Sequence, residues 1–132
     1  MLLACEGKPS IQNPKPSQIR KVLLALRSFG PSSYASLTDD AGSYVQVAGG
    51  GVSCLLELYQ ADTGKRLRAY GDIQNKACPD GTLLVSRAGE IPMMADEWFI
   101  ADKVADAFCS FLEGRELSAG IHWRPAPAKH EQ

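Results

Sequence analysis

The chain has 132 residues, with 14 Lys and Arg against 15 Asp and Glu, and a formal net charge of −1 at pH 7. This length suits one ordinary domain, which can bury a hydrophobic core without disulfides or a structural metal. The balanced charge provides no general attraction for nucleic acid or an anionic membrane, and no run approaches the ~20 apolar residues of a membrane helix. We therefore expect neither a nucleic-acid partner nor a membrane partner.

The first twelve residues show no clear apolar period, and we expect residues 1–12 to be a loose lead-in to a single domain over residues 13–124. An N-cap at Asn13 or Ser17 begins an amphipathic helix, which the pair Gly30-Pro31 ends. The helix carries apolar residues at helical spacing: Ile19, Val22, Leu23 and Leu26.

From residue 33 onward the apolar period changes to two, which is typical of strands. The pattern predicts an antiparallel meander with short turns and four strands, over residues 33–38, 43–48, 52–60 and 65–73. Asp39 and Asp40 fall in the first turn, where aspartate favours local backbone hydrogen bonds, so we interpret this carboxylate pair as a turn feature.

Three consecutive glycines, residues 49–51, raise the question of a phosphate-binding loop. Such a loop requires a following helix whose N-terminus faces the anion, usually with Gly-Lys-Ser/Thr. The next residues, VSCLLELYQ, are strand-like instead. We interpret the glycines as a hairpin turn.

The second half of the chain is less regular. A fifth apolar run follows the turn 79–81 and occupies residues 82–86, and residues 87–95 are expected to be a loop or an edge strand. A second amphipathic helix starts near Asp96 or Asp102 and ends at Gly114. Its apolar face is made of Ala101, Val104, Ala105, Phe108, Phe111 and Leu112.

Two further segments complete the chain. The short run 121–124, IHWR, fits a last edge strand, and residues 125–132 are expected to be a disordered tail. Together these elements predict an α+β domain, an antiparallel meander sheet of four to six strands with two helices packed on one face. The alternative is a closed or strongly curled small barrel.

The four cysteines are Cys5, Cys54, Cys78 and Cys109, with no CxxC pair and no histidine at ligand spacing. A zinc site is therefore not expected, and Cys54 and Cys109 lie in apolar runs where a thiol behaves as a small buried hydrophobe. We expect a reducing, cytoplasmic location. The segment LLAC at residues 2–5 looks like the end of a lipoprotein signal, but the basic and apolar regions before it are missing unless the true start lies upstream of Met1.

Strand alternation separates the meander residues into two faces. One face is apolar: Val45, Val47, Val52, Cys54, Leu56, Leu58, Leu67 and Ala69. The other is rich in Tyr and Arg: Tyr44, Gln46, Glu57, Tyr59, Arg66, Arg68 and Tyr70. Because two helices suffice to cover the apolar face, we expect the Tyr/Arg face to stay open.

Tyr and Arg are enriched at protein–protein hot spots, so the predicted partner-binding residues are Tyr44, Tyr59, Arg66, Arg68 and Tyr70. The structural alternative is cross-strand pairs that stabilise a solvated sheet. An RNA platform is disfavoured because the RNP-type signature is absent. A second candidate surface is acidic and lies on the second helix: Asp102, Asp106 and Glu113.

No catalytic residue is identified. His122 and His130 are the only histidines, and no serine or cysteine in a nucleophile-elbow setting accompanies them. The acids Asp96, Glu97, Asp102 and Asp106 fit the solvated face and first turn of a helix better than a metal site. We therefore expect no enzyme activity, no metal and no cofactor.

Several segments together resemble a known protein family. After an Asn-Pro opening and a short helix come SYVQVAGG (43–50), LLELYQ (55–60), AFCSFLEG (107–114) and IHWR (121–124). In this order they resemble small bacterial immunity proteins of polymorphic-toxin and contact-dependent inhibition systems. The resemblance implies a cytoplasmic, non-enzymatic protein that neutralises a cognate toxin by direct binding, and a homodimer is a further partner to consider.

Two other functions are weighed against this one. A small-molecule-binding module would have a pocket of ~300 Å³ or more between sheet and helices, lined by residues such as Trp98, Phe99, Phe108 and Trp123. A hydrolase would need a bound metal or a triad around His122. The identity of the toxin and the oligomeric state do not follow from the sequence.

Overall fold

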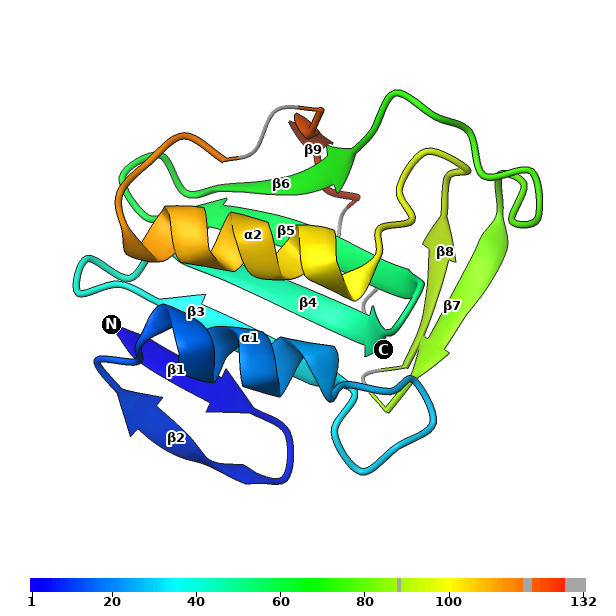
Figure 1. Ribbon diagram of the computed structural model, residues 1–132. Coiled ribbons are helices and arrows are strands. Elements are labelled where there is room, and N and C mark those ends of the chain that lie inside the picture. The colour runs from blue at the N-terminus through cyan, green and yellow to red at the C-terminus, as the bar shows by residue number, and fades with distance from the viewer. Residues whose placement is uncertain (88, 118–119, 128–132) are drawn as a thin grey trace.

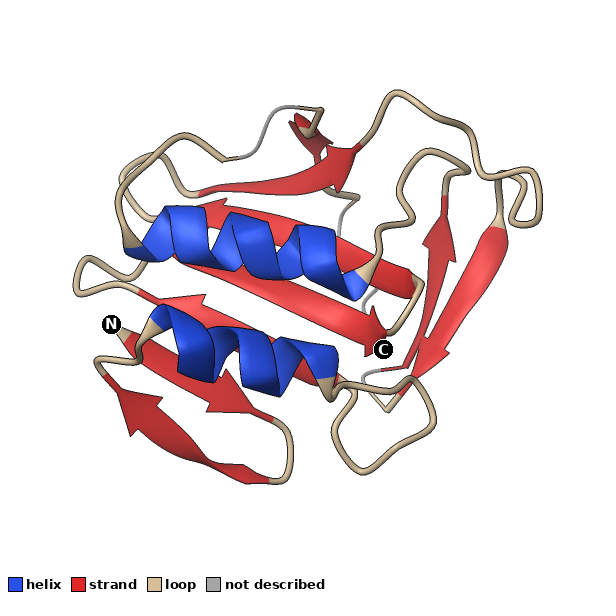
Figure 2. Cartoon of the chain, in the orientation of Figure 1, coloured by secondary structure: helices blue, strands red, loops and turns tan. Residues whose placement is uncertain are grey.

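The computed structural model describes residues 1–87, 89–117 and 120–127 (Figure 1). Its main feature is a seven-stranded antiparallel sheet of order β2-β1-β3-β4-β5-β6-β9, with helices α1 and α2 side by side on one face (Figure 2). A separate hairpin, β7–β8, completes the fold. The predicted α+β class with two helices on one face of an antiparallel sheet is confirmed, although the main sheet has seven strands. The sheet stays open, so the barrel alternative is wrong.

The elements have the following bounds: β1 Leu2–Cys5, β2 Lys8–Gln12, α1 Pro16–Leu24, β3 Tyr34–Thr38, β4 Tyr44–Gly50, β5 Ser53–Gln60, β6 Lys65–Tyr70, β7 Thr82–Ser86, β8 Gly89–Met93, α2 Ala101–Leu112 and β9 His122–Pro125. The four meander strands and the fifth apolar run lie where the period of two predicts them. Residues 87–95 contain β8, and IHWR supplies the edge strand β9. In the first turn, the Oδ1 atom of Asp39 accepts from the N–H groups of Ala41 and Ser43, each at 2.9 Å.

The prediction of a loose lead-in over residues 1–12 is wrong. These residues form the β1–β2 hairpin, and β1 pairs with β3 so that Leu3 lies opposite Leu37. Leu3 is 1% exposed and belongs to the core. Strands this short carry little periodic signal, and the partner of β1 lies more than thirty positions along the chain.

The predicted tail also differs in part. Pro125 belongs to β9, the N–H of Ala126 donates to the carbonyl of Arg66 at 2.9 Å, and Pro127 accepts from the Arg66 side chain at 3.0 Å. Residues 128–132, including His130, lie outside the described residues.

Both helices begin later than the earliest start that the sequence suggests. Helix α1 starts with Pro16, the position where a missing N–H costs nothing, and the N–H of Lys15 donates to Oε1 of Gln18 at 2.8 Å. It ends at Leu24, well before Gly30, yet Leu26 remains buried in the connection. No described helix has the length and apolar character needed to cross a membrane.

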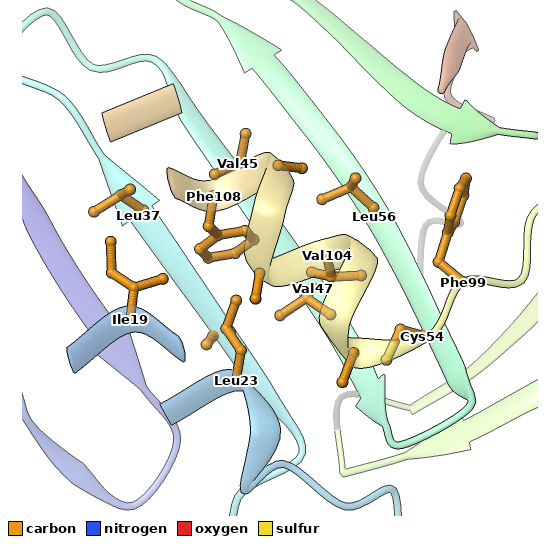
Figure 3. Close-up of a cluster of buried hydrophobic side chains, with 14 of the residues drawn as sticks. Ile19, Leu23, Leu37, Val45, Val47, Cys54, Leu56, Phe99, Val104 and Phe108 are labelled. Atoms are coloured by element: carbon orange, nitrogen blue, oxygen red, sulfur yellow. The ribbon is translucent and has the colours of Figure 1, made fainter. Parts of the chain in front are cut away.

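The main core lies between the helices and the sheet. Figure 3 shows Phe108 of α2 close to Ile19 and Leu23 of α1, above Val45 and Val47 of the sheet. Phe108 and Ile19 are fully buried, and each such side chain contributes about 1.5–3 kcal/mol relative to exposure. Most of the predicted apolar strand positions belong to this core or pack against it: Val45, Val47, Cys54, Leu56, Leu58 and Ala69. Val52 instead lies in the β4–β5 turn and is 74% exposed.

A smaller core lies on the opposite face of the sheet. There, Leu84 and Met93 of the β7–β8 hairpin pack against Leu55 of β5, with Ala48 and Ile91 at the margin. Leu55 alternates with the residues that face the helices, so the hairpin covers part of the Tyr/Arg face. The expectation that two helices are the only cover, and that this face is fully open, is therefore wrong.

The glycine run lies where the end of β4 passes close to the segment that follows α1. A Cβ atom built on Gly50 would lie 2.3 Å from the carbonyl oxygen of Leu26 and 2.7 Å from Cα of Arg27. The N–H of Gly49 donates to the carbonyl of Ser33 at 2.8 Å. The predicted hairpin turn is confirmed only for Gly51, which forms the turn with Val52; Gly49 and Gly50 belong to β4 and let the end of that strand contact the segment after α1.

All four cysteines fall within the described residues and are free, with Cys54 and Cys109 buried. Burial raises the pKa of the Cys54 thiol to about 12 and also raises that of Cys109. We expect iodoacetamide at pH 8 to modify Cys5 and Cys78 in the folded protein and to spare Cys54 and Cys109, because the thiolate is the reactive form. Peptide mass spectrometry with and without urea checks this, and rapid labelling of Cys54 without urea would contradict it.

Candidate binding face

The face of the sheet opposite the helices carries one continuous row of polar side chains, here called the polar row. Cross-strand register places Ser36, Gln46, Glu57, Arg68 and Arg124 side by side across β3, β4, β5, β6 and β9. Nε2 of Gln46 donates to Oε1 of Glu57, and Nε of Arg68 donates to Oε2 of the same carboxylate, both at 3.0 Å. The polar row is thus a linked network and not a set of independent side chains.

Arg68 is the centre of this network and is enclosed. Its side chain is 6% exposed, and it also contacts Oε1 of Glu97 at 3.4 Å and donates to the carbonyl of Pro92 at 3.2 Å. Glu97 is 2% exposed and accepts from the N–H of Met94 at 2.7 Å. The hairpin and the segment after it therefore bury Arg68, which corrects the expectation that it lies on an open surface.

Arg124 closes the network at the edge of the sheet. It donates to Oδ2 of Asp96 at 2.7 Å, contacts Oε2 of Glu97 at 3.4 Å, and lies 4.0 Å above the ring of Tyr70. A guanidinium over an aromatic face is a favourable cation–π geometry. The predicted binding residue Tyr70 is therefore held against Arg124 and, at 5.3 Å between ring centroids, against His122.

Three of the predicted binding residues come together in the next row of the same face. Tyr44 and Tyr59 stack with their ring centroids 5.1 Å apart, and Arg66 lies opposite Tyr59 on β6. Arg66 also approaches Oε1 of Glu57 at 3.5 Å. All three side chains are half-buried, so Tyr44, Tyr59 and Arg66 form an accessible group. Its two stacked aromatic residues, Tyr44 and Tyr59, are here called the tyrosine pair.

Beside this group the sheet face is hollowed into a cavity of about 470 Å³. Ala4, Ser36 and Ala48 supply small side chains to its lining, and Gln46 and Glu57 of the polar row also belong to it. The remaining lining residues come from β1, the β1–β2 turn, β3, β4, β5 and β8: Cys5, Glu6, Tyr34, Ala35, Val47, Leu55 and Ile91. Small residues on strands that otherwise carry long side chains produce this hollow.

A second ion-pair system fixes the rim of the cavity. Oε1 of Glu6 accepts from the N–H and hydroxyl of Ser33, and Nε of Arg87, next to the hairpin tip, donates to Oε2 at 2.7 Å. Burial by itself raises the pKa of Glu6, but the hydrogen bonds from Ser33 and Arg87 outweigh it and hold that pKa below its ordinary value. Glu6 therefore ties the β7–β8 hairpin to the β1–β2 turn as a carboxylate.

The alternative acidic surface lies on the exposed side of α2. Asp106 pairs with Arg20 of α1 at 2.6 Å, and Glu113 pairs with Arg115. Asp102 is exposed on the same helix. Because two of the three carboxylates have an arginine partner, this surface is less strongly negative than the sequence indicates.

The pocket expected between sheet and helices does not match the main cavity. Phe99 and Phe108 are buried in the core, and neither the 470 Å³ cavity nor a second of about 330 Å³ between the β1–β2 hairpin and α1 is lined by Trp98, Phe99, Phe108 or Trp123. His122 bonds Asp72 at 2.7 Å in an exposed position. Within residues 1–87, 89–117 and 120–127, no group of three His, Cys, Asp or Glu side chains is placed to hold a metal.

Several residues of this face were not predicted from the sequence. Ser36 and Arg124 occupy outward positions by the same alternation that identifies Gln46, so a longer periodic analysis would find them. Glu6 lies in a turn and carries no periodic signal. The expectation that Asp96 and Glu97 lie at the solvated start of a helix is wrong, because α2 begins at Ala101 and both carboxylates pair with arginines of the sheet, with Glu97 2% exposed. Comparison with known proteins adds no identification, because no family model, no curated protein and no solved structure matches the chain.

Proposed function

We propose that the chain is an immunity protein, a non-enzymatic cytoplasmic protein that neutralises a bacterial toxin by direct binding through the face opposite the helices. The observation that carries the proposal is the 470 Å³ cavity lined by Gln46 and Glu57. Tyr44 and Tyr59 stand two positions along the same strands, about 7 Å away. A concave site bordered by aromatic side chains can receive a projecting residue of a partner.

The rigidity of the face supports the same proposal. Three carboxylates and three arginines balance in charge across the polar row and its neighbours: Glu57, Glu97, Asp96, Arg66, Arg68 and Arg124. Side chains held by such pairs lose little further freedom on binding, which lowers the entropic cost of association. The four free thiols agree with a reducing compartment.

The direct test looks for a toxin domain among the neighbouring genes and uses any such domain as the candidate partner; neighbouring genes that encode no toxin would count against the proposal. Co-expression should restore growth of cells that produce the toxin, and calorimetry with the purified pair should show saturable binding at one to one. Growth that stays arrested, together with no heat of binding, would rule out neutralisation of that toxin by contact.

The binding face can be tested with one truncation. Tyr59→Ala should weaken toxin binding by about 1–3 kcal/mol, or roughly 5-fold to 150-fold in Kd, because it removes half of the tyrosine pair. The matched control is Phe29→Ala, since Phe29 is an aromatic residue that is 92% exposed in the connection after α1. Binding that survives Tyr59→Ala but is lost on Asp102→Lys with Asp106→Lys would move the site to α2.

The cavity also favours a second candidate, a small-molecule-binding module. Its volume of about 470 Å³ lies within the usual range of about 300–1,000 Å³ for ligand sites. A fitting compound should raise the melting temperature of the protein, and Ser36→Phe should remove that shift by filling the lining. A toxin-binding role requires no such stabilisation.

A further inference from the structure

The edge strands of this protein differ in how well they could accept another strand. Strand β2 contains Lys8 and Pro9, and strand β9 contains Pro125. Strand β8 contains Pro92, whose carbonyl already accepts a hydrogen bond from Arg68. Proline and lysine discourage edge-to-edge pairing. The remaining edge strand, β7, reads TLLVS and contains neither a charge nor a proline.

The backbone of β7 presents free hydrogen-bonding groups at its outer edge. Leu83 lies opposite Pro92, which has no N–H, so this pair must be of the non-hydrogen-bonded kind. By alternation the N–H and C=O groups of Leu83 and Val85 point away from β8. Among the described strands β7 pairs with β8 alone, and Figure 1 shows β7 on the outer side of the hairpin.

The side chains of β7 are also divided between two faces. Leu84 is 2% exposed and packs toward the large sheet, whereas Leu83 is 46% and Val85 is 45% exposed on the outward face. An edge strand with unpaired backbone and exposed apolar side chains is a template for an added strand.

We propose that β7 pairs antiparallel with β7 of a second copy of this chain, about a two-fold axis at Leu84. This register makes hydrogen-bonded pairs of Leu83 with Val85 of the second copy, and of Val85 with Leu83 of the second copy. The exposed apolar side chains of the two copies then meet on one face, and two hairpins become one four-stranded sheet. An uncharged strand is compatible with facing its own copy, because like charges directly opposite would repel.

The residues that flank β7 favour the same register. It places Arg87 opposite Gly81 of the second copy, one residue from Asp80, so that opposite charges flank both ends of the paired strands. The side chain of Arg87 is 63% exposed and can approach this carboxylate while its Nε stays with Glu6. No residue of β7 lines the 470 Å³ cavity, whereas Ile91 of β8 does and Arg87 borders it, so the two proposed surfaces are adjacent and use different strands.

The first experiment measures the mass of the full chain by sedimentation over a range of concentrations. We expect a species of twice the 14.2 kDa monomer mass that dissociates on dilution. Leu83→Pro removes an outward N–H and the exposed leucine side chain but no hydrogen bond to β8, and Val85→Lys places a charge at the pairing edge. Each should raise the dimer dissociation constant ~10-fold or more, because the two-fold axis applies every change twice. The control is Ile73→Lys, an apolar residue that is 83% exposed in the β6–β7 connection.

A second experiment tests the register. Chains carrying Leu83→Cys mixed with chains carrying Val85→Cys should form an oxidised dimer, whereas neither variant alone should exceed the wild-type background of its four native cysteines. Circular dichroism verifies that each variant is folded. A chain that stays monomeric at every concentration, or a dimer that is unaffected by Leu83→Pro and Val85→Lys, would overturn the proposal.

Discussion

Arg68→Met should lower the free energy of unfolding by about 3–5 kcal/mol, the usual result of removing one partner from a buried ion pair. The substitution keeps much of the side-chain volume but removes the guanidinium that contacts both Glu57 and Glu97. These carboxylates are 5% and 2% exposed, so water cannot replace the lost partner. Urea titration followed by circular dichroism measures the change.

Two variants make this result interpretable. Arg20→Met breaks the exposed pair with Asp106 and should cost no more than about 1 kcal/mol. Combining Arg68→Met with Glu57→Gln and Glu97→Gln should recover part of the stability, because the two buried carboxylates, each otherwise left with one longer contact to Arg66 or Arg124, are then replaced by neutral amides. A loss below 1 kcal/mol for Arg68→Met would mean that the network is solvated.

Local periodicity was sufficient to predict the meander and the two helices. The alternation of Val45 and Val47 with Tyr44 and Gln46 assigns each to the correct face, because a strand in a half-buried sheet repeats every two residues. The spacing of Ile19 and Leu23 likewise identifies the face of α1 that enters the core.

The parts that were not predicted depend on contacts between distant segments. The strand β1 is stabilised by pairing with β3, and the β7–β8 hairpin lies on the sheet because Leu84 and Met93 meet Leu55. Neither contact leaves a trace in the local pattern of the shorter partner. Because the hairpin packs on the sheet, it also determines which side chains of the face beneath it are buried.

The candidate site shows the same limit at the level of single residues. An outward arginine on a strand is compatible with a binding anchor or with a buried ion pair, and the residue type does not distinguish them. Arg68 and Arg66 both alternate outward, but only Arg68 lies under the hairpin and beside Glu97. Their different burial arises from a segment almost thirty positions away, which the sequence of β6 does not encode.

Gly50→Ala should also destabilise the fold strongly, by about 3 kcal/mol, the upper part of the range for overpacking a well-packed site. Gly50 is buried, and an added Cβ would be 2.3 Å from the carbonyl oxygen of Leu26 and 2.7 Å from Cα of Arg27. Both atoms belong to the backbone, so no side chain can rotate out of the way. The end of β4 or the segment after α1 would have to shift, which unfolding experiments would detect as a lower urea midpoint.

The neighbouring Gly51 provides the matched control within the same run. Its φ is +64°, and a Cβ there would meet no atom within 4 Å, so Gly51→Ala should cost only the roughly 1–2 kcal/mol of a left-handed backbone. Gly51→Asn should cost less, because asparagine tolerates that conformation. If Gly50→Ala costs no more than Gly51→Ala, close contact with Leu26 is not what requires glycine at position 50. If Gly50→Ala costs more than Gly51→Ala, glycine is required at position 50 so that β4 can pack against the segment after α1. The turn alone then does not explain the three consecutive glycines.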